Sequence, residues 1–385
     1  MLLSKGFEVE MYTGTSDGSI VGLSDVITAN LSGFVKEPDS RNVEYTTPPL
    51  HQYERLLCEL VSPRRRLRQF LKNLDPSYTL LPGSTLSTGD SHRFYRSDPS
   101  NPYHGYIEDT YGTDVVTASI HINLGISDPE LLMQACRLIR VEAPLILALS
   151  ASSPFLDGQA TGYHSTRWQL FPQTPKQVPL FESHGHFISW TEEQLRLGTM
   201  QNVRHLWTSV RPNGDCRPYK LNRLELRISD LITDPIHLLA VTALLEARLI
   251  QLQQNPRLDP LAASVFKAQS RQADLLELID HNEQAVARSS LDAELRHWQH
   301  GRSITARDWL MQLYDEVLPV AKALGIACFL TPIKQILREG NQAQVWLKQY
   351  DSGMSVQEIM AETIRIMDSQ EQALQSELCL PASVG

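Results

Sequence analysis

Two glutamates near the start of the chain, Glu8 and Glu10, alternate with apolar residues in the pattern of a β-strand. Both carboxylates therefore share one face of the predicted strand, with side-chain roots about 7 Å apart. At an effective dielectric of about 20, two charges at that distance repel by roughly 2 kcal/mol. The pair therefore lies either on a solvated, exposed face or in a cleft where cations offset the repulsion.

Other predicted strands also carry polar groups on one face. These groups are Glu44 in residues 41–47, His121 and Asn123 in residues 115–124, and Glu225 and Arg227 in residues 223–228. Each pattern alone is typical of a half-buried antiparallel sheet with one wet face. Together they predict a sheet whose polar face collects carboxylates, a histidine and an arginine. Such oxygen-rich sites select hard divalent cations such as Mg²⁺ or Mn²⁺.

Several motifs of common enzyme classes do not occur in the sequence. It contains neither the Gly-x-x-x-x-Gly-Lys-Ser/Thr sequence of a P-loop nor the Gly-x-Gly-x-x-Gly sequence of a dinucleotide-binding fold. The Gly-x-Ser-x-Gly and His-Glu-x-x-His motifs are also absent. These observations argue against the common nucleotide-binding loops, the α/β-hydrolases and the zincins.

The composition of the chain is that of a globular protein of 385 residues with a net charge of −9. The negative charge argues against general nucleic-acid binding. No signal-peptide pattern opens the chain, and no uninterrupted apolar run reaches membrane-spanning length. We therefore expect a cytoplasmic protein without a membrane partner.

The five cysteines are scattered along the chain and form no Cys-x-x-Cys pair. They are Cys58, Cys136, Cys216, Cys328 and Cys379. Because neither a zinc-binding spacing nor a redox dithiol is present, we expect reduced thiols in a cytoplasmic protein.

Strand and helix patterns mix over the first 230 residues, whereas the last 150 residues are predicted to be almost entirely helical. This change predicts a catalytic region over residues 1–255 and a helical region over residues 256–385 packed on the same domain. Residues 82–113 and 150–177 lack periodicity and are expected to form long ordered loops.

Two helix starts and one helix break are predicted from local signals. Asp128-Pro129 and Asp234-Pro235 each place an N-cap residue before a proline and an apolar run. Ser62-Pro63 predicts that an earlier helix bends or restarts there, followed by a basic run on a solvated face. The members of that run are Arg64, Arg65, Arg66 and Arg68.

Five segments occur in the order found in glutamate–cysteine ligases. They are Glu8-Val9-Glu10, IHINLG at 120–125, LSASSPF at 149–155, TGYHSTR at 161–167, and Glu225-Leu226-Arg227. The chain resembles the carboxylate–amine ligase branch of the glutamine-synthetase-like superfamily, and most of all its cyanobacterial type, over about residues 3–250. The 149–155 and 161–167 segments are the most specific part of the resemblance. Asn123 stands where relatives often carry a second histidine.

The resemblance implies an α+β fold with a curved antiparallel sheet, its active site on the concave polar face and its helices behind. It also implies that ATP phosphorylates the side-chain carboxylate of L-glutamate and that the amine of L-cysteine attacks the acyl phosphate. The product is γ-glutamylcysteine, the precursor of glutathione. ATP and Mg²⁺, or Mn²⁺ in its place, are the implied cofactors.

The resemblance also implies roles for individual residues of this sequence. Metal ligands are expected at Glu8, Glu10, Glu44 and Glu225, and a metal or phosphate contact is expected at His121. Arg227 is expected to contact a phosphate or the acyl phosphate. Arg167 is expected to contact a substrate carboxylate, and Arg211 the ATP phosphates. A salt bridge is the alternative for Arg167 and Arg211.

Three alternative functions remain open from the sequence. The chain could join glutamate to another amine, bind nucleotide or glutamate without catalysis, or act as a metal-dependent hydrolase on the same acidic face. The oligomeric state is also open, since the helical C-terminal region could cover the site or mediate self-association.

Overall fold

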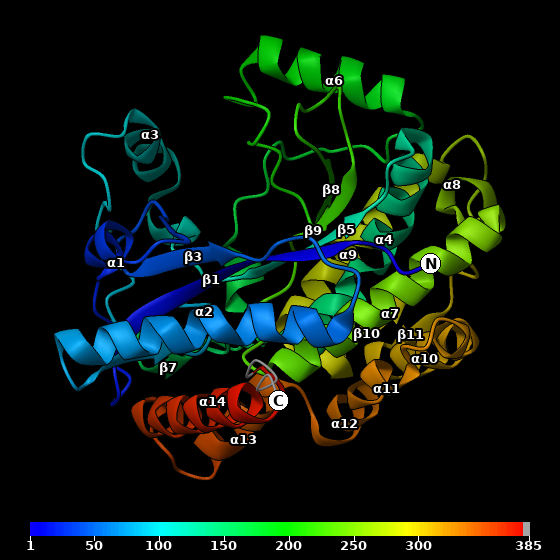
Figure 1. Ribbon diagram of the computed structural model, residues 1–385. Helices are drawn as coiled ribbons and strands as arrows, with labels where there is room; N and C mark the ends of the chain where they lie inside the picture. The colour runs from blue at the N-terminus through cyan, green and yellow to red at the C-terminus, as the bar shows by residue number, and fades with distance from the viewer. Residues whose placement is uncertain (380–385) are drawn as a thin grey trace, which may run out of the picture.

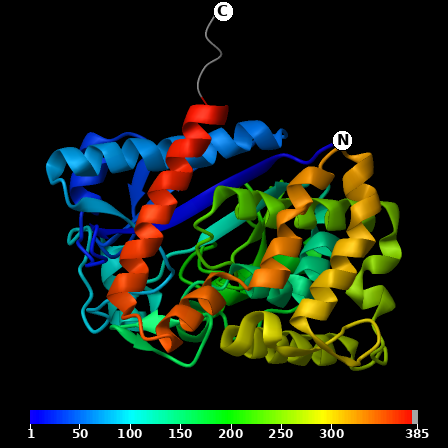
Figure 2. The same ribbon diagram turned by 90° about the horizontal axis from the view of Figure 1, so that it is seen from below.

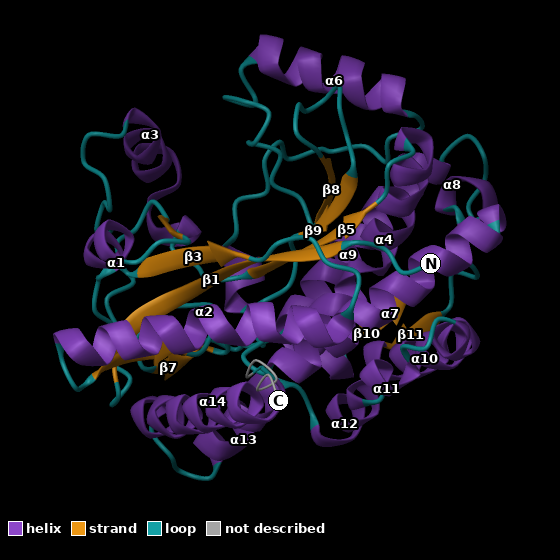
Figure 3. Ribbon diagram, in the orientation of Figure 1, coloured by secondary structure: helices purple, strands orange, loops and turns teal. Residues whose placement is uncertain are grey.

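A seven-stranded antiparallel sheet is the centre of the protein, whose computed structural model describes residues 1–379 (Figure 1 and Figure 3). The order of the main path is β2-β3-β1-β5-β9-β8, and β4 pairs with the far end of β1. The strands are β1 (Lys5–Thr15), β2 (Phe34–Lys36), β3 (Asn42–Thr46), β4 (Tyr78–Leu81), β5 (Ile120–Gly125), β8 (Val210–Asn213) and β9 (Arg223–Leu226). The predicted α+β class, with helices behind an antiparallel sheet, is confirmed.

Strand β1 has the two-faced character that its alternating sequence predicts. Phe7, Val9 and Met11 are almost completely buried on the apolar side of the sheet. Glu8 and Glu10 are only partly covered on the other side. The period of two along the strand separates the core from the polar face.

Three long helices cover the apolar face of the sheet, and a fourth packs behind them. Helix α2 (Tyr53–Leu74) contacts β4, α4 (Pro129–Ser150) contacts β8 and β9, and α7 (Pro235–Gln254) contacts both α2 and α4. Helix α9 (Arg271–Ser289) packs on α4. Figure 1 shows α2 and α7 below the sheet, while α3 (Pro102–Tyr111) and α6 (His184–Leu197) lie above it.

The two helix starts predicted from Asp-Pro pairs are confirmed. The side chain of Asp128 accepts hydrogen bonds from the backbone N–H groups of Glu130 and Leu131 at the start of α4. Asp234 caps α7 in the same way through the N–H of Ile236. Each cap satisfies helix donors that have no partner within the helix.

Helix α7 is the only helix of the described residues that is long and apolar enough to cross a membrane. In the structure 83% of its most apolar window is buried inside the protein. This is the position of a core helix, and it explains why α7 is apolar on nearly all sides.

The chain beyond α7 is mostly helical, as expected, and packs on α2, α4 and α7 (Figure 2). Its helices are α8 (Pro260–Ala263), α9, α10 (Ala306–Ala323), α11 (Ala327–Leu330), α12 (Pro332–Glu339), α13 (Gln342–Asp351) and α14 (Val356–Leu378). A short hairpin of β10 (Glu294–Arg296) and β11 (Ser303–Thr305) interrupts them. The division of the chain near residue 255 remains a prediction.

The predicted restart at Ser62-Pro63 is wrong, because α2 continues through Pro63 as one helix, and the alternative of a bend there stays a prediction. The solvated-face interpretation of the arginine run is also wrong for two of its members. Arg64 and Arg68 are buried, and the Nε of Arg68 donates to Glu371 of α14 over 2.7 Å. Tertiary pairing with α14 therefore explains the basic run, and α14 crosses α2 in Figure 2.

A disulfide joins Cys58 of α2 to Cys379 at the end of α14, with a Cα–Cα distance of 5.3 Å. The expectation that all five thiols are reduced is therefore wrong for this pair. Sequence spacing contains no sign of the pairing because 321 residues separate the two cysteines. The other three cysteines are free thiols.

The two predicted loops contain more regular structure than expected. Helix α3 occupies the end of residues 82–113, because Asn101 caps a helix that has Pro102 in its first turn. Within 150–177 lie the hairpin β6 (Phe155–Leu156) and β7 (Gln159–Ala160) and the helix α5 (Thr166–Leu170). The remaining helix, α1 (Ser24–Asn30), precedes β2.

Candidate functional site

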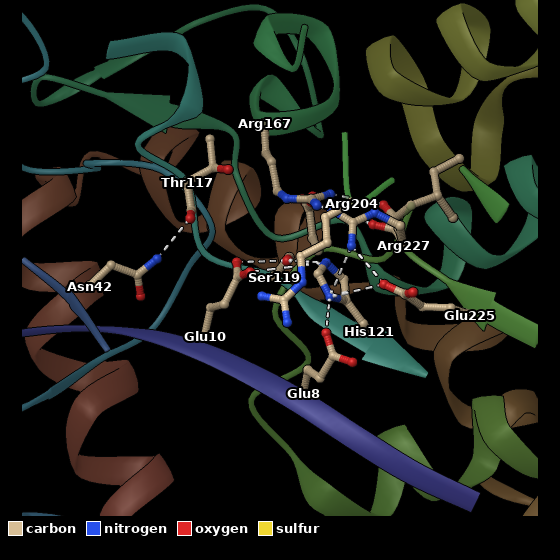
Figure 4. Close-up of polar contacts among 12 residues, drawn as sticks. Glu8, Glu10, Asn42, Thr117, Ser119, His121, Arg167, Arg204, Glu225 and Arg227 are labelled. Carbon is tan, nitrogen blue, oxygen red and sulfur yellow. Dashed lines mark hydrogen bonds and ion pairs between the residues drawn. The ribbon is translucent and has the colours of Figure 1, made fainter. Parts of the chain in front are cut away.

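Strand register brings the predicted polar residues together on one face of the sheet. Glu8 lies directly opposite His121, and Glu225 lies opposite Asn123. The Oε2 atom of Glu8 is 2.8 Å from Nδ1 of His121, and Nδ2 of Asn123 donates to Glu8 Oε1 over 3.2 Å. Figure 4 shows Glu8, Glu10, His121 and Glu225 pointing toward one another from three strands. The common polar face expected from the sequence is therefore present.

Glu225 is the fully buried centre of the basic side of this face. Nε and Nη2 of Arg211 donate to its two oxygens over 2.7 and 2.9 Å, and Nη1 of Arg227 donates to Oε1 over 2.7 Å. Nδ2 of Asn213 donates a further bond of 2.6 Å. Although burial favours the neutral acid, Arg211 and Arg227 hold the pKa of Glu225 well below its usual range. Its carboxylate is therefore charged and fixed in place.

A second acidic group lies beside the first and includes a residue that the sequence analysis missed. Glu10 and Glu44 are opposite each other on β1 and β3, and Glu37 follows β2. One oxygen from each of Glu10, Glu37 and Glu44 lies within 4.8 Å of the others. Oγ of Ser119 donates to Glu10 over 2.7 Å. We call Glu10, Glu37 and Glu44 the acidic triad.

The apolar spacing of Ile27, Leu31, Phe34 and Val35 predicts a helix that reaches residue 35, and this prediction left Glu37 out of the expected site. The structure instead ends α1 at Asn30 and places Phe34 and Val35 in strand β2, opposite Tyr45 and Glu44. Phe34 is buried and Val35 is exposed, which is the alternation of a strand. Extending that alternation past β2 is the sequence signal that could have found Glu37.

Within the described part of the chain, the acidic triad lacks the arginine ion pairs that Glu225 has. Burial, and then repulsion by Glu10 and Glu8, raises the pKa of Glu44 to about 8. Burial and the neighbouring carboxylates also raise the pKa of Glu37 well above its ordinary value. By contrast, burial and Glu225 oppose ionisation of Glu8, but the His121 hydrogen bond leaves its pKa lowered. The site is therefore polarised, with compensated charge at Glu225 and uncompensated acids at the triad.

We expect the metal-free protein to lose thermal stability as the pH rises from about 5 to 8. Glu44 keeps its proton in the folded state up to a pKa of about 8, whereas in the unfolded chain it ionises near 4.5. Between these values the native state binds more protons, so the free energy of unfolding falls as pH rises, by at most about 1.4 kcal/mol per pH unit for one group. Melting temperature measured in EDTA across this range checks the prediction.

Glu44→Gln is the matched variant for this measurement, because it removes the titrating group and keeps its shape. The variant is expected to have a flatter pH profile and a higher melting temperature at pH 8. A metal-free protein whose stability is constant or rises between pH 5 and 8 would contradict the assignment of the raised pKa.

Arg167 and Arg211 donate most of their hydrogen bonds to other groups of the protein itself. Arg167 is 1% exposed, and its Nη1 and Nη2 donate to the carbonyls of Ile228 and Arg227 over 3.1 Å each. Nη1 of Arg211 donates to the carbonyls of Arg204 and Leu206, while its other nitrogens hold Glu225. This geometry favours the salt-bridge and supporting alternative for both arginines. Their substrate and phosphate contacts remain predictions.

Oxygen donors that could hold a hard divalent cation are abundant on this face. The acidic triad supplies three carboxylates that crowd one another with no arginine or lysine ion pair among residues 1–379, and a bound cation would relieve that repulsion. Glu8, His121 and Glu225 also bring one atom each within 4.8 Å of one another. Because arginines already occupy Glu225, the triad fits a divalent cation better than the second group does.

Comparison with known proteins gives a family match over nearly the whole chain. The sequence profile described as "Glutamate-cysteine ligase family 2" matches residues 4–370. A protein of Sorangium cellulosum named "Putative glutamate--cysteine ligase 2" is 30% identical over 247 residues, which cover 64% of this chain and 62% of the relative. One of Rubrobacter xylanophilus with the corresponding name is 26% identical over 314 residues, 79% of each chain.

Two solved structures share the fold at low sequence identity. A glutamate–cysteine ligase of Francisella tularensis in complex with AMP superposes with a TM-score of 0.74 at 14% identity, covering 100% of this chain and 91% of the other. A bifunctional glutathione synthetase of Pasteurella multocida superposes with a TM-score of 0.70, also at 14% identity, covering 98% of this chain and 53% of the other. Both therefore support the antiparallel sheet with helices behind it.

Proposed function

Because this chain belongs to glutamate–cysteine ligase family 2, a family of C–N ligases, we propose that it joins L-glutamate to L-cysteine with ATP. In the proposed reaction the side-chain carboxylate of glutamate attacks the γ-phosphorus of ATP and displaces ADP. The cysteine amine then attacks the acyl carbon, phosphate leaves, and the amine loses a proton. The product is γ-glutamylcysteine, which would serve glutathione synthesis.

The observation that carries this proposal is the separation of charge on the polar face of the sheet. Uncompensated carboxylates gather at the acidic triad, whereas Arg211 and Arg227 surround Glu225. A reaction between ATP and a carboxylate brings several negative charges together and needs both cations and fixed positive groups. The two halves of the site match these two requirements.

The acidic triad and Glu8 are the residues that we propose would hold Mg²⁺, or Mn²⁺ in its place. When bound there, the ion would neutralise phosphate charge during transfer. The fit rests on the three triad carboxyl groups, which bring one oxygen each within 4.8 Å of one another. The raised pKa values of Glu37 and Glu44 show that burial and this crowding oppose their ionisation in the metal-free protein.

Arg227 is the residue that we propose contacts the transferring phosphoryl group. Its Nη1 is fixed by Glu225, and its buried Nε has no hydrogen-bond partner among residues 1–379. An arginine held in this way keeps its charge and loses little freedom on binding an anion. His121, between Glu8 and Glu10, would orient both carboxylates through its two ring nitrogens.

The proposal is tested by incubating the purified protein with ATP, Mg²⁺, L-glutamate and one amine from a panel of amino acids. Phosphate release and the mass of the product are followed together. Release that requires L-cysteine, with γ-glutamylcysteine as the product, is the expected result.

Each alternative function gives a different outcome in the same assay. Release with another amine identifies a different glutamate ligase, and turnover without ATP identifies a hydrolase. Silence with every amine, combined with measurable nucleotide binding, identifies a non-catalytic relative. Any of these three results would overturn the proposed reaction. The proposal also includes a cytoplasmic location and small-molecule substrates, and self-association of the chain stays a prediction.

A further inference from the structure

A second cleft, of about 1200 Å³, lies against helix α9 and the segment around α5. Trp168, Phe171 and Glu283 line it, together with Tyr111. None of the residues assigned to the acidic triad or to the arginine pair lines this cleft.

Glu283 is an unusual residue for the wall of a cleft, because only 3% of its surface is exposed. Its Oε2 atom accepts hydrogen bonds from Nε1 of Trp168 over 3.2 Å and from Nε2 of Gln173 over 3.1 Å. Its Oε1 atom has no partner in hydrogen-bond geometry among the described residues, and neither has the nearby Ser209 hydroxyl, a neutral group that favours the charged carboxylate and lowers the pKa of Glu283. A buried carboxylate with one unpaired oxygen is costly unless a further donor is supplied.

The protein supplies little positive charge to Glu283. Burial raises the pKa of Glu283 to about 7, and the charged groups that act on it are Arg140 of α4 and Asp280 of its own helix. Nη1 of Arg140 donates to the carbonyls of Val178 and Pro179 rather than to this carboxylate. Asp280, one helical turn before Glu283, also lines the cleft and adds negative charge.

Aromatic rings form the wall beside this carboxylate. Trp168 and Phe171 stack with ring centroids 5.6 Å apart and planes 12° apart. The guanidinium of Arg167 lies 5.9 Å from the Trp168 ring centroid and 5.5 Å from that of Phe171, and Arg167 does not itself line the cleft. These rings therefore already accept one cation, as aromatic faces in cation–π contacts do.

We propose that this cleft binds a small monoamine with an apolar or aromatic body. The ammonium group lies toward Glu283 and Asp280, and the body lies against Trp168. Apolar walls with a few convergent polar groups are typical of small-molecule sites. Lys176 and Arg288 also line the cleft, so a ligand with several positive charges is disfavoured.

Isothermal titration of the full-length protein with benzylamine and with benzyl alcohol at pH 8 tests the proposal. The two probes have nearly the same shape, but only benzylamine carries a charge. Glu283 is mostly ionised at this pH, which is above its pKa of about 7. We expect benzylamine to bind at least about tenfold more tightly than benzyl alcohol. The reason is that a hydrogen bond between charged groups is stronger than one between a charged and a neutral group.

Two variants connect this preference to the cleft. Glu283→Gln removes the charge with little change of shape and is expected to abolish the preference for benzylamine, whereas Glu277→Gln, at an exposed position of the same helix, is expected to keep it. If Glu283→Gln does not fold, Asp280→Asn at an exposed position is expected to weaken the preference. Equal affinity for the two probes, no saturable binding of either, or a preference unchanged in the variants would overturn the proposal.

Discussion

Glu10→Gln is expected to lower the ligation rate by at least about 100-fold, because even the outer partners of a bound metal contribute about 10–100-fold. The substitution removes one carboxylate of the acidic triad and keeps an oxygen that can accept the hydrogen bond from Ser119. Glu10 also raises the pKa of Glu37 and Glu44 by repulsion. Its replacement should therefore leave the metal-free protein as stable as the wild type or more stable.

Activity and stability are measured on the same sample to separate function from folding. Phosphate release with glutamate, cysteine and ATP gives the rate, and the melting temperature in EDTA gives the stability. Glu54→Gln, at an exposed position of α2, is the control and should change neither. Full turnover by Glu10→Gln at ordinary magnesium would refute the assignment of Glu10, and loss of both activity and fold would show that Glu10 is structural.

Glu225→Gln is expected to destabilise the protein by about 3–5 kcal/mol, the usual cost of removing one partner from a buried ion pair. Glu225 is 0% exposed and forms ion pairs with both Arg211 and Arg227. Without its charge, two buried guanidinium groups would face each other in a region of low dielectric. The effect is opposite to that of Glu10→Gln, although both changes remove one carboxylate from the same sheet face.

Urea denaturation, followed by circular dichroism, measures the free energy of unfolding of the Glu225 variant. The comparison with Glu54→Gln separates the buried ion pair from the general effect of losing a surface charge, which is usually within about 0.5 kcal/mol. A Glu225→Gln protein as stable as this control would mean that the arginines do not depend on Glu225 for their position.

Much of the fold could be predicted because its signals are local. The alternation around Glu8 and Glu10 shows a two-faced strand without any knowledge of its neighbours, since side chains alternate along every strand. Asp128 and Asp234 mark helix starts because the cap, the proline and the apolar run lie within a few residues. The errors arose where local signals are ambiguous, as at Pro63, which helix α2 accommodates.

The sequence predicts which residues belong to the candidate site better than it predicts which of these residues contact one another. Glu8, His121 and Glu225 are on one face, as expected, but only the register shows that Glu8 meets His121. Glu37 was missed because a short strand was assigned to a helix. For Arg211 the sequence left open an ATP-phosphate contact or a salt bridge, and only the structure shows its ion pair with Glu225, which lies 14 residues later on the neighbouring strand.

The sequence by itself determined which side chains share the polar face of each strand, because that depends on a period of two along one segment. It also carried the motifs that indicate a glutamate–cysteine ligase. Only the tertiary structure decided which charges are paired: Glu225 with two arginines, the acidic triad with none, and α2 with α14. The reason is physical, since burial and charge neighbours depend on which segments meet in space, and residues 303 positions apart, such as Arg68 and Glu371, carry no mutual signal along the chain.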